Sequence, residues 1–214
     1  MIKNLSQKIK DDIKGYQFQH EAWTCWITCI KNIFTTMKRH YNKCPNPSIH
    51  KLHKIVKAKY GFIPNYNVVT TLINEKILAN STFILREKTN SNMKEFKQIV
   101  DNNFMSPVIF SVSSNDYFKE LNRKYNYHQT GYVTEGISKL DHTLIAFDID
   151  EDIIFFDPFV PHLRLFGKHS PEKAMFKLSN IIMNRLWLNA KIPNWIMWLE
   201  KPTAQTTLSM EFKK

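Results

Sequence analysis

Apolar residues recur at helical spacing through much of the chain, most regularly over residues 25–38. Six apolar positions in that stretch fall on one face of a helix, which predicts a buried helix beginning at Cys25. After a proline-rich break, Ser48 is typical of a residue that caps the start of the next helix. Similar patterns predict further helices over residues 48–59, 67–78, 93–102, 115–124 and 170–183.

Strand patterns lie mostly later in the chain. Short apolar or alternating runs, bounded by turn residues, predict strands over residues 81–86, 107–112, 142–147, 153–157 and 195–200. The acidic turn at residues 148–152 joins the third and fourth of these strands into a hairpin. Because helices come first and strands come late, the expected fold class is α+β, with a helical lobe packed on a late antiparallel β-sheet.

The length of the chain predicts one folded domain. A chain of 214 residues can bury a substantial core, and the sequence has no internal repeat or clear domain boundary. Residues 1–14 are polar and Lys-rich, which predicts a flexible basic arm. Residues 15–201 form the predicted domain, and residues 202–214 a polar tail. Residues 125–140 lack a period and predict a loop.

The charge balance suggests an acidic partner. The formal net charge is +11, mostly from lysine, and such a surface attracts acidic proteins, nucleic acids and anionic membranes. No basic cluster is interleaved with aromatic residues, so no specific nucleic-acid partner is predicted. A solvated Lys-rich surface without a recognition role is the plainer alternative. The sequence makes no prediction about oligomeric state.

Three features bear on cellular location. No apolar run is long enough to span a membrane, and the N-terminal residues lack the apolar segment of a secretory signal. The three cysteines, Cys25, Cys29 and Cys44, have no disulfide-framework spacing, which is typical of a reducing compartment. We therefore expect a cytoplasmic protein, or one delivered into a host cell by a specialised secretion system.

The residues from Gln19 to Trp26 carry the most informative chemistry. Cys25 lies at the start of the predicted helix, where free N–H groups and the positive end of the dipole lower a thiol's pKa. Gln19 lies six residues upstream, and its amide can fold back to donate a hydrogen bond to a developing oxyanion. A cysteine at this place is also a common small core residue, so further groups must decide between the two interpretations.

His142 and Asp157, on the two strands of the predicted hairpin, are the candidates for those further groups. A two-residue loop at either residues 149–150 or residues 150–151 puts both side chains on one face of the hairpin. An odd-length loop puts them on opposite faces, unless a β-bulge restores the register. When the two side chains share a face, the carboxylate can orient the imidazole toward a thiol.

These motifs resemble the papain-like cysteine peptidase superfamily, in particular the bacteriocin-leader-processing peptidases and the papain-like effector proteases of bacterial pathogens. Those families have a Gln six residues before the Cys, then a late histidine strand that leads to an Asp-Pro strand. The chain departs from the compact processing peptidases at Thr24 and Trp26, where they usually have Asp and Gly. The matching residues are Gln19, Cys25, Trp26, His142, Asp157 and Pro158.

The resemblance implies that residues 15–201 are a papain-like catalytic domain. It makes Cys25 the nucleophile, His142 the base, Asp157 the group that orients the base, and Gln19 part of the oxyanion hole. The implied reaction is hydrolysis of a peptide or isopeptide bond through a thioacyl-enzyme. Separately, the net charge favours an acidic protein or peptide as the substrate.

Two alternatives stay open at this point. The same residues serve a glutamine deamidase or an acyl transferase in some members of the superfamily, and such an enzyme can be a secreted effector. The other alternative is a non-catalytic basic binding module. No cofactor or metal is predicted, because His50 and His53 have no third ligand in the pattern.

Overall fold

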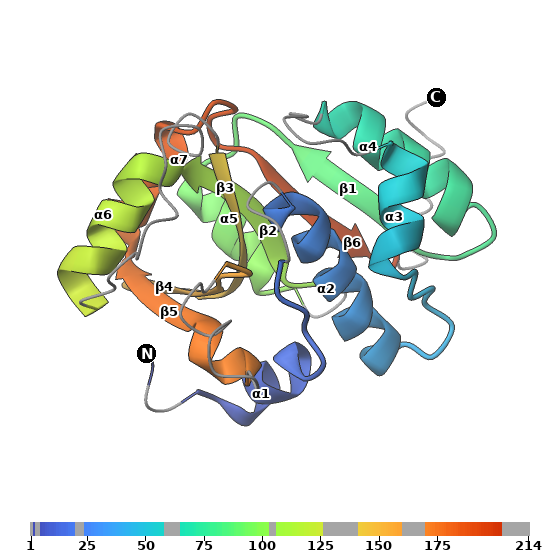
Figure 1. Cartoon of the computed structure of the whole chain (residues 1–214), viewed down its shortest axis with the longest axis horizontal. Helices are drawn as coiled ribbons and strands as arrows, with labels where there is room; N and C mark the ends of the chain where they lie inside the picture. The colour runs from blue at the N-terminus through green and yellow to red at the C-terminus, as the bar shows by residue number, and fades with distance from the viewer. Residues whose placement is uncertain are drawn as a thin grey trace.

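In the part of the chain that the structure describes, six strands form one antiparallel sheet, around which the helices are arranged (Figure 1). The computed structural model describes residues 2, 5–19, 24–57, 65–102, 106–125, 141–159 and 170–202. The order across the sheet is β1-β6-β2-β3-β4-β5. The strands are β1 (Ile84–Lys88), β2 (Val108–Ser113), β3 (Asp141–Ile149), β4 (Asp152–Phe156), β5 (Met175–Ser179) and β6 (Ile196–Glu200).

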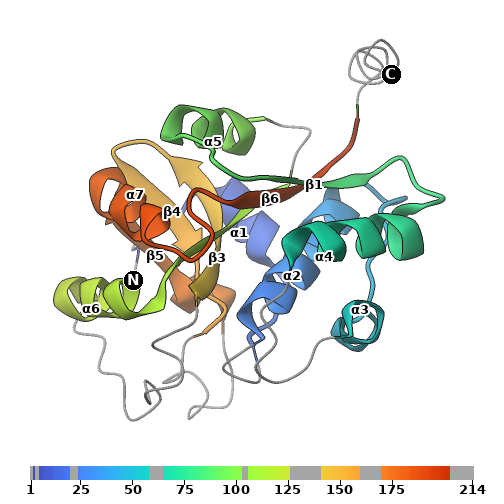
Figure 2. The ribbon, with the colours of Figure 1, turned by 90° about the horizontal axis from the view of Figure 1, so that it is seen from above.

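Helices cover both faces of this sheet. They are α1 (Gln7–Ile13), α2 (Cys25–His40), α3 (Ile49–Val56), α4 (Tyr66–Ile73), α5 (Met93–Val100), α6 (Ser114–Tyr125) and α7 (Asn180–Leu188). Figure 2 shows α1 and α2 on one side of the sheet and α5 and α7 on the other. Aromatic contacts agree with this arrangement, since the Phe96 ring of α5 lies against both Phe110 of β2 and Trp187 of α7. The core therefore has two layers, one on each face of the sheet.

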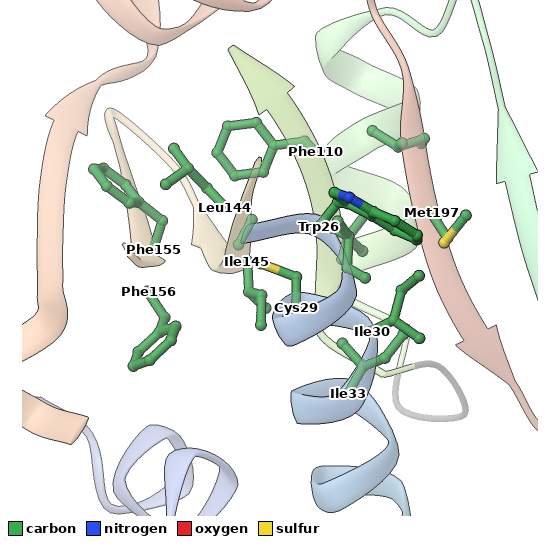
Figure 3. Packing of buried hydrophobic residues seen from close by; sticks show 14 of the residues in the cluster. Trp26, Cys29, Ile30, Ile33, Phe110, Leu144, Ile145, Phe155, Phe156 and Met197 are labelled. Carbon is green, nitrogen blue, oxygen red and sulfur yellow. The ribbon is translucent and has the colours of Figure 1, made fainter. Parts of the chain in front are cut away.

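The helix α2 is the central element of one layer. Its stripe of apolar residues is buried against the sheet, as the helical spacing predicts. Figure 3 shows Trp26 extending toward β6, where Met197 lies, while Cys29 lies nearer to Ile145 of β3. Because this buried stripe fixes the rotation of α2, it also fixes the position of Cys25 at the first turn.

The β3–β4 hairpin has the geometry that brings its two polar residues to one face. Near the turn, Ile149 lies opposite Ile153, which corresponds to an odd-length connection. The register then shifts between Ala146 and Asp148, and Ala146 lies opposite Phe155. This β-bulge is the compensation that an odd loop requires. His142 and Asp157 are each an even number of residues from the Ala146–Phe155 pair, so their side chains share a face.

Most predicted elements are present, with two corrections. The predicted helix over residues 170–183 is wrong: residues Pro171–Ala174 form a 3₁₀ turn, β5 follows, and α7 begins only at Asn180. Met175, Phe176 and Leu178 are buried while Lys177 is exposed, which suits an outer strand. A short apolar run such as residues 175–178 is compatible with either a helix or a strand. Its hydrogen bonding with β4 makes it a strand.

The expected flexible arm is a second correction. Residues Gln7–Ile13 form the helix α1, whose start is capped by the Ser6 hydroxyl. Ile9 and Ile13 are buried in the main core, so this segment packs on the domain. Arg39 of α2 donates hydrogen bonds to the backbone carbonyls of Asp12 and Lys14 at the end of α1. Except for their first residues, the predicted loop over residues 125–140 and the predicted tail over residues 202–214 lie outside the described residues.

At each outer edge of the sheet, a side chain bonds to the backbone of one strand residue. The Asn74 amide, in a π-helical turn that continues α4, accepts from the Leu85 N–H at 2.8 Å and donates to the Leu85 carbonyl at 3.0 Å. At the opposite edge, the Tyr125 hydroxyl donates to the Lys177 carbonyl at 2.7 Å and accepts from the Lys177 N–H at 3.0 Å. Each outer strand thus has backbone groups satisfied by a side chain.

Candidate active site

Cys25 is the first residue of α2, and its side chain is only 6% exposed. The helix begins there because the backbone of the preceding residue, Thr24, is not helical. The Thr24 carbonyl accepts the first helical hydrogen bond, from the Thr28 N–H. The first N–H groups of a helix have no partner within it, so the thiol lies at the positive end of the dipole. This position favours the thiolate form of Cys25.

The structure brings His142 and Asp157 together. His142 is the second residue of β3, and its Nε2 atom lies 2.7 Å from Oδ1 of Asp157, just after β4. Both side chains are buried, His142 at 4% exposure and Asp157 at 0%. Because Nε2 is engaged with the carboxylate, Nδ1 is the ring nitrogen that remains for the hydrogen bond with the Cys25 thiol.

Two further donors hold the Asp157 carboxylate. The Tyr117 hydroxyl of α6 donates to Oδ2 at 2.7 Å, and the Phe159 N–H donates to Oδ1 at 2.7 Å. The Asp157 N–H itself donates to the Ala174 carbonyl at 2.9 Å. A buried carboxylate is costly unless its oxygens accept hydrogen bonds, and here both oxygens do. The carboxylate is therefore fixed in position beneath the imidazole.

Aromatic rings surround His142. Those of Tyr117, Phe118 and Phe159 have their centroids 5.4, 5.3 and 6.3 Å from the imidazole. Burial alone would lower the pKa of His142, but the charge and hydrogen bond of Asp157, and then Cys25, outweigh it and raise that pKa above its ordinary value. The imidazole is thereby held in its protonated form.

The pKa of the Cys25 thiol is shifted in the opposite direction, below its ordinary value. Burial opposes its ionisation, yet the hydrogen bond and charge of His142, together with hydrogen bonds from the backbone and side chain of Thr143, lower the pKa of Cys25 below that of a free thiol. A thiolate beside an imidazolium is the arrangement that thiol catalysis needs.

Gln19 belongs to the same region through its backbone. Its N–H donates to the Pro158 carbonyl at 3.0 Å, one residue beyond Asp157, and its side chain is 3% exposed. This bond ties the segment that precedes α2 to the end of the hairpin. Its predicted role as an oxyanion donor stays a prediction.

The other two cysteines differ from Cys25. Cys29 is fully buried and donates to the Thr143 carbonyl at 3.4 Å, and burial raises its pKa well above that of a free thiol. Burial also raises the pKa of the Cys44 thiol, to about 12. Thiols with raised pKa values remain protonated near neutral pH, so Cys29 and Cys44 are poor nucleophiles.

Sequence reasoning missed four polar residues near this site: Tyr66, Ser111, Tyr117 and Thr143. Ser111 and Thr143 had a usable signal, because each is a polar residue inside an otherwise apolar strand. Tyr66 and Tyr117 had none, since an aromatic residue on a helix is usually part of the core.

Two features are absent from the residues that the structure describes. No group of three or more His, Cys, Asp or Glu side chains within them is arranged to hold a metal ion. Among the helices built from those residues, none has the length and apolar character required to cross a membrane.

No protein-family model matches this sequence, and no curated protein matches it significantly. Among solved structures, a putative C39-like peptidase from Bacillus anthracis is similar over 90% of this chain and 96% of its own, with a TM-score of 0.56 and 12% identity. The peptidase domain of Streptococcus ComA, a bifunctional ABC transporter involved in a quorum-sensing pathway, aligns with 87% of this chain and 99% of its own. Its TM-score is 0.45 and its identity 13%.

The similarity to the Bacillus structure concerns the fold. It confirms the predicted α+β, papain-like architecture, with the cysteine helix packed on a sheet that carries the histidine and the aspartate. It also confirms, at the level of fold, the resemblance to the compact processing peptidases. The chemistry must be argued from this chain's own residues.

Proposed function

We propose that this protein is a cysteine peptidase in which Cys25, His142 and Asp157 form the catalytic triad. The observation that carries the proposal is the buried contact series from the Cys25 thiol through His142 to Asp157, at the start of a helix in a C39-like fold. Opposite pKa shifts of the thiol and the imidazole favour the ion pair. A buried group whose pKa is shifted by a specific charged partner is a candidate for a functional site.

In the proposed reaction, the Cys25 thiolate attacks the carbonyl carbon of the scissile peptide bond. A carbon–sulfur bond forms, and the carbonyl π electrons move to the oxygen. When the tetrahedral intermediate collapses, the carbon–nitrogen bond breaks and the leaving amine takes a proton from Nδ1 of His142. Water, deprotonated by His142, then attacks the thioester, and release of the carboxylic acid regenerates the ion pair.

The proposal gives separate roles to Asp157 and Gln19. Asp157 orients the imidazole and stabilises its protonated form. Gln19 and the Cys25 N–H donate to the oxyanion, where preorganised donors are most effective. The bond from the Gln19 N–H to Pro158 supports this role, because it ties the donor segment to the segment that holds Asp157.

The test is a comparison of two protein samples on a complex proteome. The unmodified protein and the Cys25→Ala variant are incubated with the same extract, and mass spectrometry identifies new peptide termini and deamidated glutamines. The peptidase proposal predicts new termini that require Cys25. Deamidation or acyl transfer without new termini would replace it with the second enzymatic reaction, and identical samples would favour the non-catalytic binding module.

A further inference from the structure

Three hydroxyl groups form a line that ends at the candidate nucleophile, on elements far apart in the sequence. The Tyr66 hydroxyl of α4 lies 3.5 Å from the Ser111 hydroxyl of β2, which lies 3.3 Å from the Thr143 hydroxyl of β3. Ser111 and Thr143 are directly opposite each other in the β2–β3 ladder. The Cys29 thiol, one turn after Cys25, donates to the Thr143 carbonyl at 3.4 Å, and hydrogen bonds from the Thr143 hydroxyl and N–H are among the causes that lower the pKa of the Cys25 thiol.

The line is fixed in place by its surroundings. Ser111 is 0% exposed and Thr143 is 1% exposed. The Tyr66 ring stacks on Trp195 of the segment before β6, with centroids 3.8 Å apart and planes at 19°. The Thr143 carbonyl is also held, because it accepts from the Cys29 thiol one turn along α2. Hydroxyls held in this way have little freedom to turn elsewhere.

We propose that Thr143 is a second donor to the Cys25 thiolate, and that Ser111 and Tyr66 are positioning residues that aim its hydroxyl at the sulfur. The proposal rests on the proposed function, because it concerns how the same nucleophile is activated. It assigns the thiolate two partners: the imidazolium of His142 and the hydroxyl of Thr143.

The direction of the hydrogen bonds follows from the donors and acceptors available. A thiolate accepts and cannot donate, so the Thr143 hydrogen must point at the sulfur. The Thr143 oxygen can then accept from Ser111, and the Ser111 oxygen from Tyr66. Such a chain polarises each successive hydroxyl, so the last donor binds the anion more strongly than an isolated threonine would.

A thiolate held only by His142 can rotate about its Cα–Cβ bond before it attacks the substrate. A second donor keeps the free sulfur in place and lowers the cost of the buried anion. The titratable groups that surround the sulfur or its two partners are His142, Asp157, Cys29, Tyr66 and Asp141. All of them remain in a Thr143→Val protein, so the substitution isolates the hydroxyl.

The experiment measures the ionisation of Cys25 directly. The ultraviolet absorbance of the thiolate is titrated in each variant, and the signal of the same variant carrying Cys25→Ala is subtracted. Removing a hydrogen bond to a charged group should raise the midpoint of Cys25 in Thr143→Val by about one pH unit or more. Thr143→Ser should restore the original midpoint, and Ser111→Ala and Tyr66→Phe should give smaller shifts in the same direction.

Thr36→Val is the matched control. Thr36 is a buried threonine near the other end of α2, and its hydroxyl donates to the Asp12 carbonyl. This variant should lose stability without moving the Cys25 midpoint. An unchanged midpoint in folded Thr143→Val would overturn the proposal. If Thr143→Val does not fold, an unchanged midpoint in Ser111→Ala overturns it instead.

The titration needs no substrate, so it separates the two proposals. A protein without Cys25-dependent cleavage but with the expected midpoint shifts would contradict the peptidase function alone. A peptidase whose midpoint is unaffected by Thr143→Val would contradict the second donor alone.

Discussion

At the scale of single residues, Cys25 and Cys29 lie one turn apart on α2, yet their surroundings shift their pKa values in opposite directions. The Cys25 thiol meets His142, whereas the Cys29 thiol donates to a backbone carbonyl in the core. Proximity to the helix start is therefore insufficient to make a nucleophile. The nearby imidazole makes the difference.

The first prediction follows from that contrast. Cys25→Ala should abolish substrate cleavage and leave the fold intact, because it removes only the sulfur at the helix start. Cys29→Ala should retain activity but lower the free energy of unfolding by about 1–2 kcal/mol, as small buried truncations do. Urea denaturation and a cleavage assay on both variants check this. An inactive, fully stable Cys29→Ala protein beside an active Cys25→Ala protein would show that the nucleophile is misassigned.

A second prediction concerns Tyr117, whose hydroxyl donates to Asp157. Tyr117→Phe should lower the free energy of unfolding by about 1.5–3 kcal/mol, because a buried carboxylate loses a donor. Cleavage should fall by about tenfold as the imidazole loses its fixed support. Tyr125→Phe, at the end of the same helix, is the control and should leave the cleavage rate unchanged. Equal rates in the two variants would argue against a role for Tyr117.

The third prediction is a pH profile. The thiolate forms as pH rises through the lowered pKa of Cys25, and the imidazolium is lost as pH rises through the raised pKa of His142. The kcat/KM of cleavage should therefore have an acid limb below the ordinary thiol value and an alkaline limb above the ordinary histidine value. Asp157→Asn should move the alkaline limb to lower pH, because it removes the charge that raises the pKa of His142. An alkaline limb that stays in place in Asp157→Asn would disprove this assignment.

The sequence allowed the candidate site residues to be proposed only as a set. A cysteine at a helix start is also a common core residue, but the upstream glutamine and the pair of His142 and Asp157 on one hairpin favour thiol chemistry at Cys25. Tyr117 and Tyr66 could not be proposed, because their roles depend on which helix packs against which strand. That packing is a tertiary property with no local pattern.

At the scale of elements, the sequence pattern predicted the two strands of the β3–β4 hairpin but not their register. The alternation of polar and apolar residues predicted the two strands, and turn length left three possible registers. The structure has the odd connection with a bulge between Ala146 and Asp148. The sequence does not locate such a bulge, because its position depends on contacts such as that between the rings of Phe147 and Tyr16.

The helix α1 provides the fourth prediction. Its many charged residues predicted a flexible arm, yet one face of the helix is packed on the core. Ile13 is 1% exposed, so Ile13→Ala should lower the free energy of unfolding by about 2–5 kcal/mol. Lys10→Ala, on the exposed side of the same helix, should change it by less than about 0.5 kcal/mol. Thermal or urea unfolding of both variants is the measurement. Similar stabilities would mean that α1 contributes little to the domain.

At the scale of the whole molecule, the net charge of +11 provides the fifth prediction. If the substrate protein is acidic, long-range attraction raises the encounter rate, and added salt screens it. Cleavage of that protein should slow with salt, mainly through kcat/KM, while cleavage of a small neutral peptide should change little. A flat salt response on the protein substrate would mean that the lysine excess has no role in recognition.

The two side chains that bond to the outer strands also bear on how the molecule meets other chains. An unpaired outer strand invites β-augmentation, in which a foreign peptide adds a strand through main-chain bonds. Here Asn74 already engages Leu85, and Tyr125 already engages Lys177, each in the pattern that an incoming strand would use. An incoming strand would have to displace Asn74 to pair with Leu85, or Tyr125 to pair with Lys177. We therefore expect a polypeptide substrate to be recognised by contacts other than strand addition at these two residues.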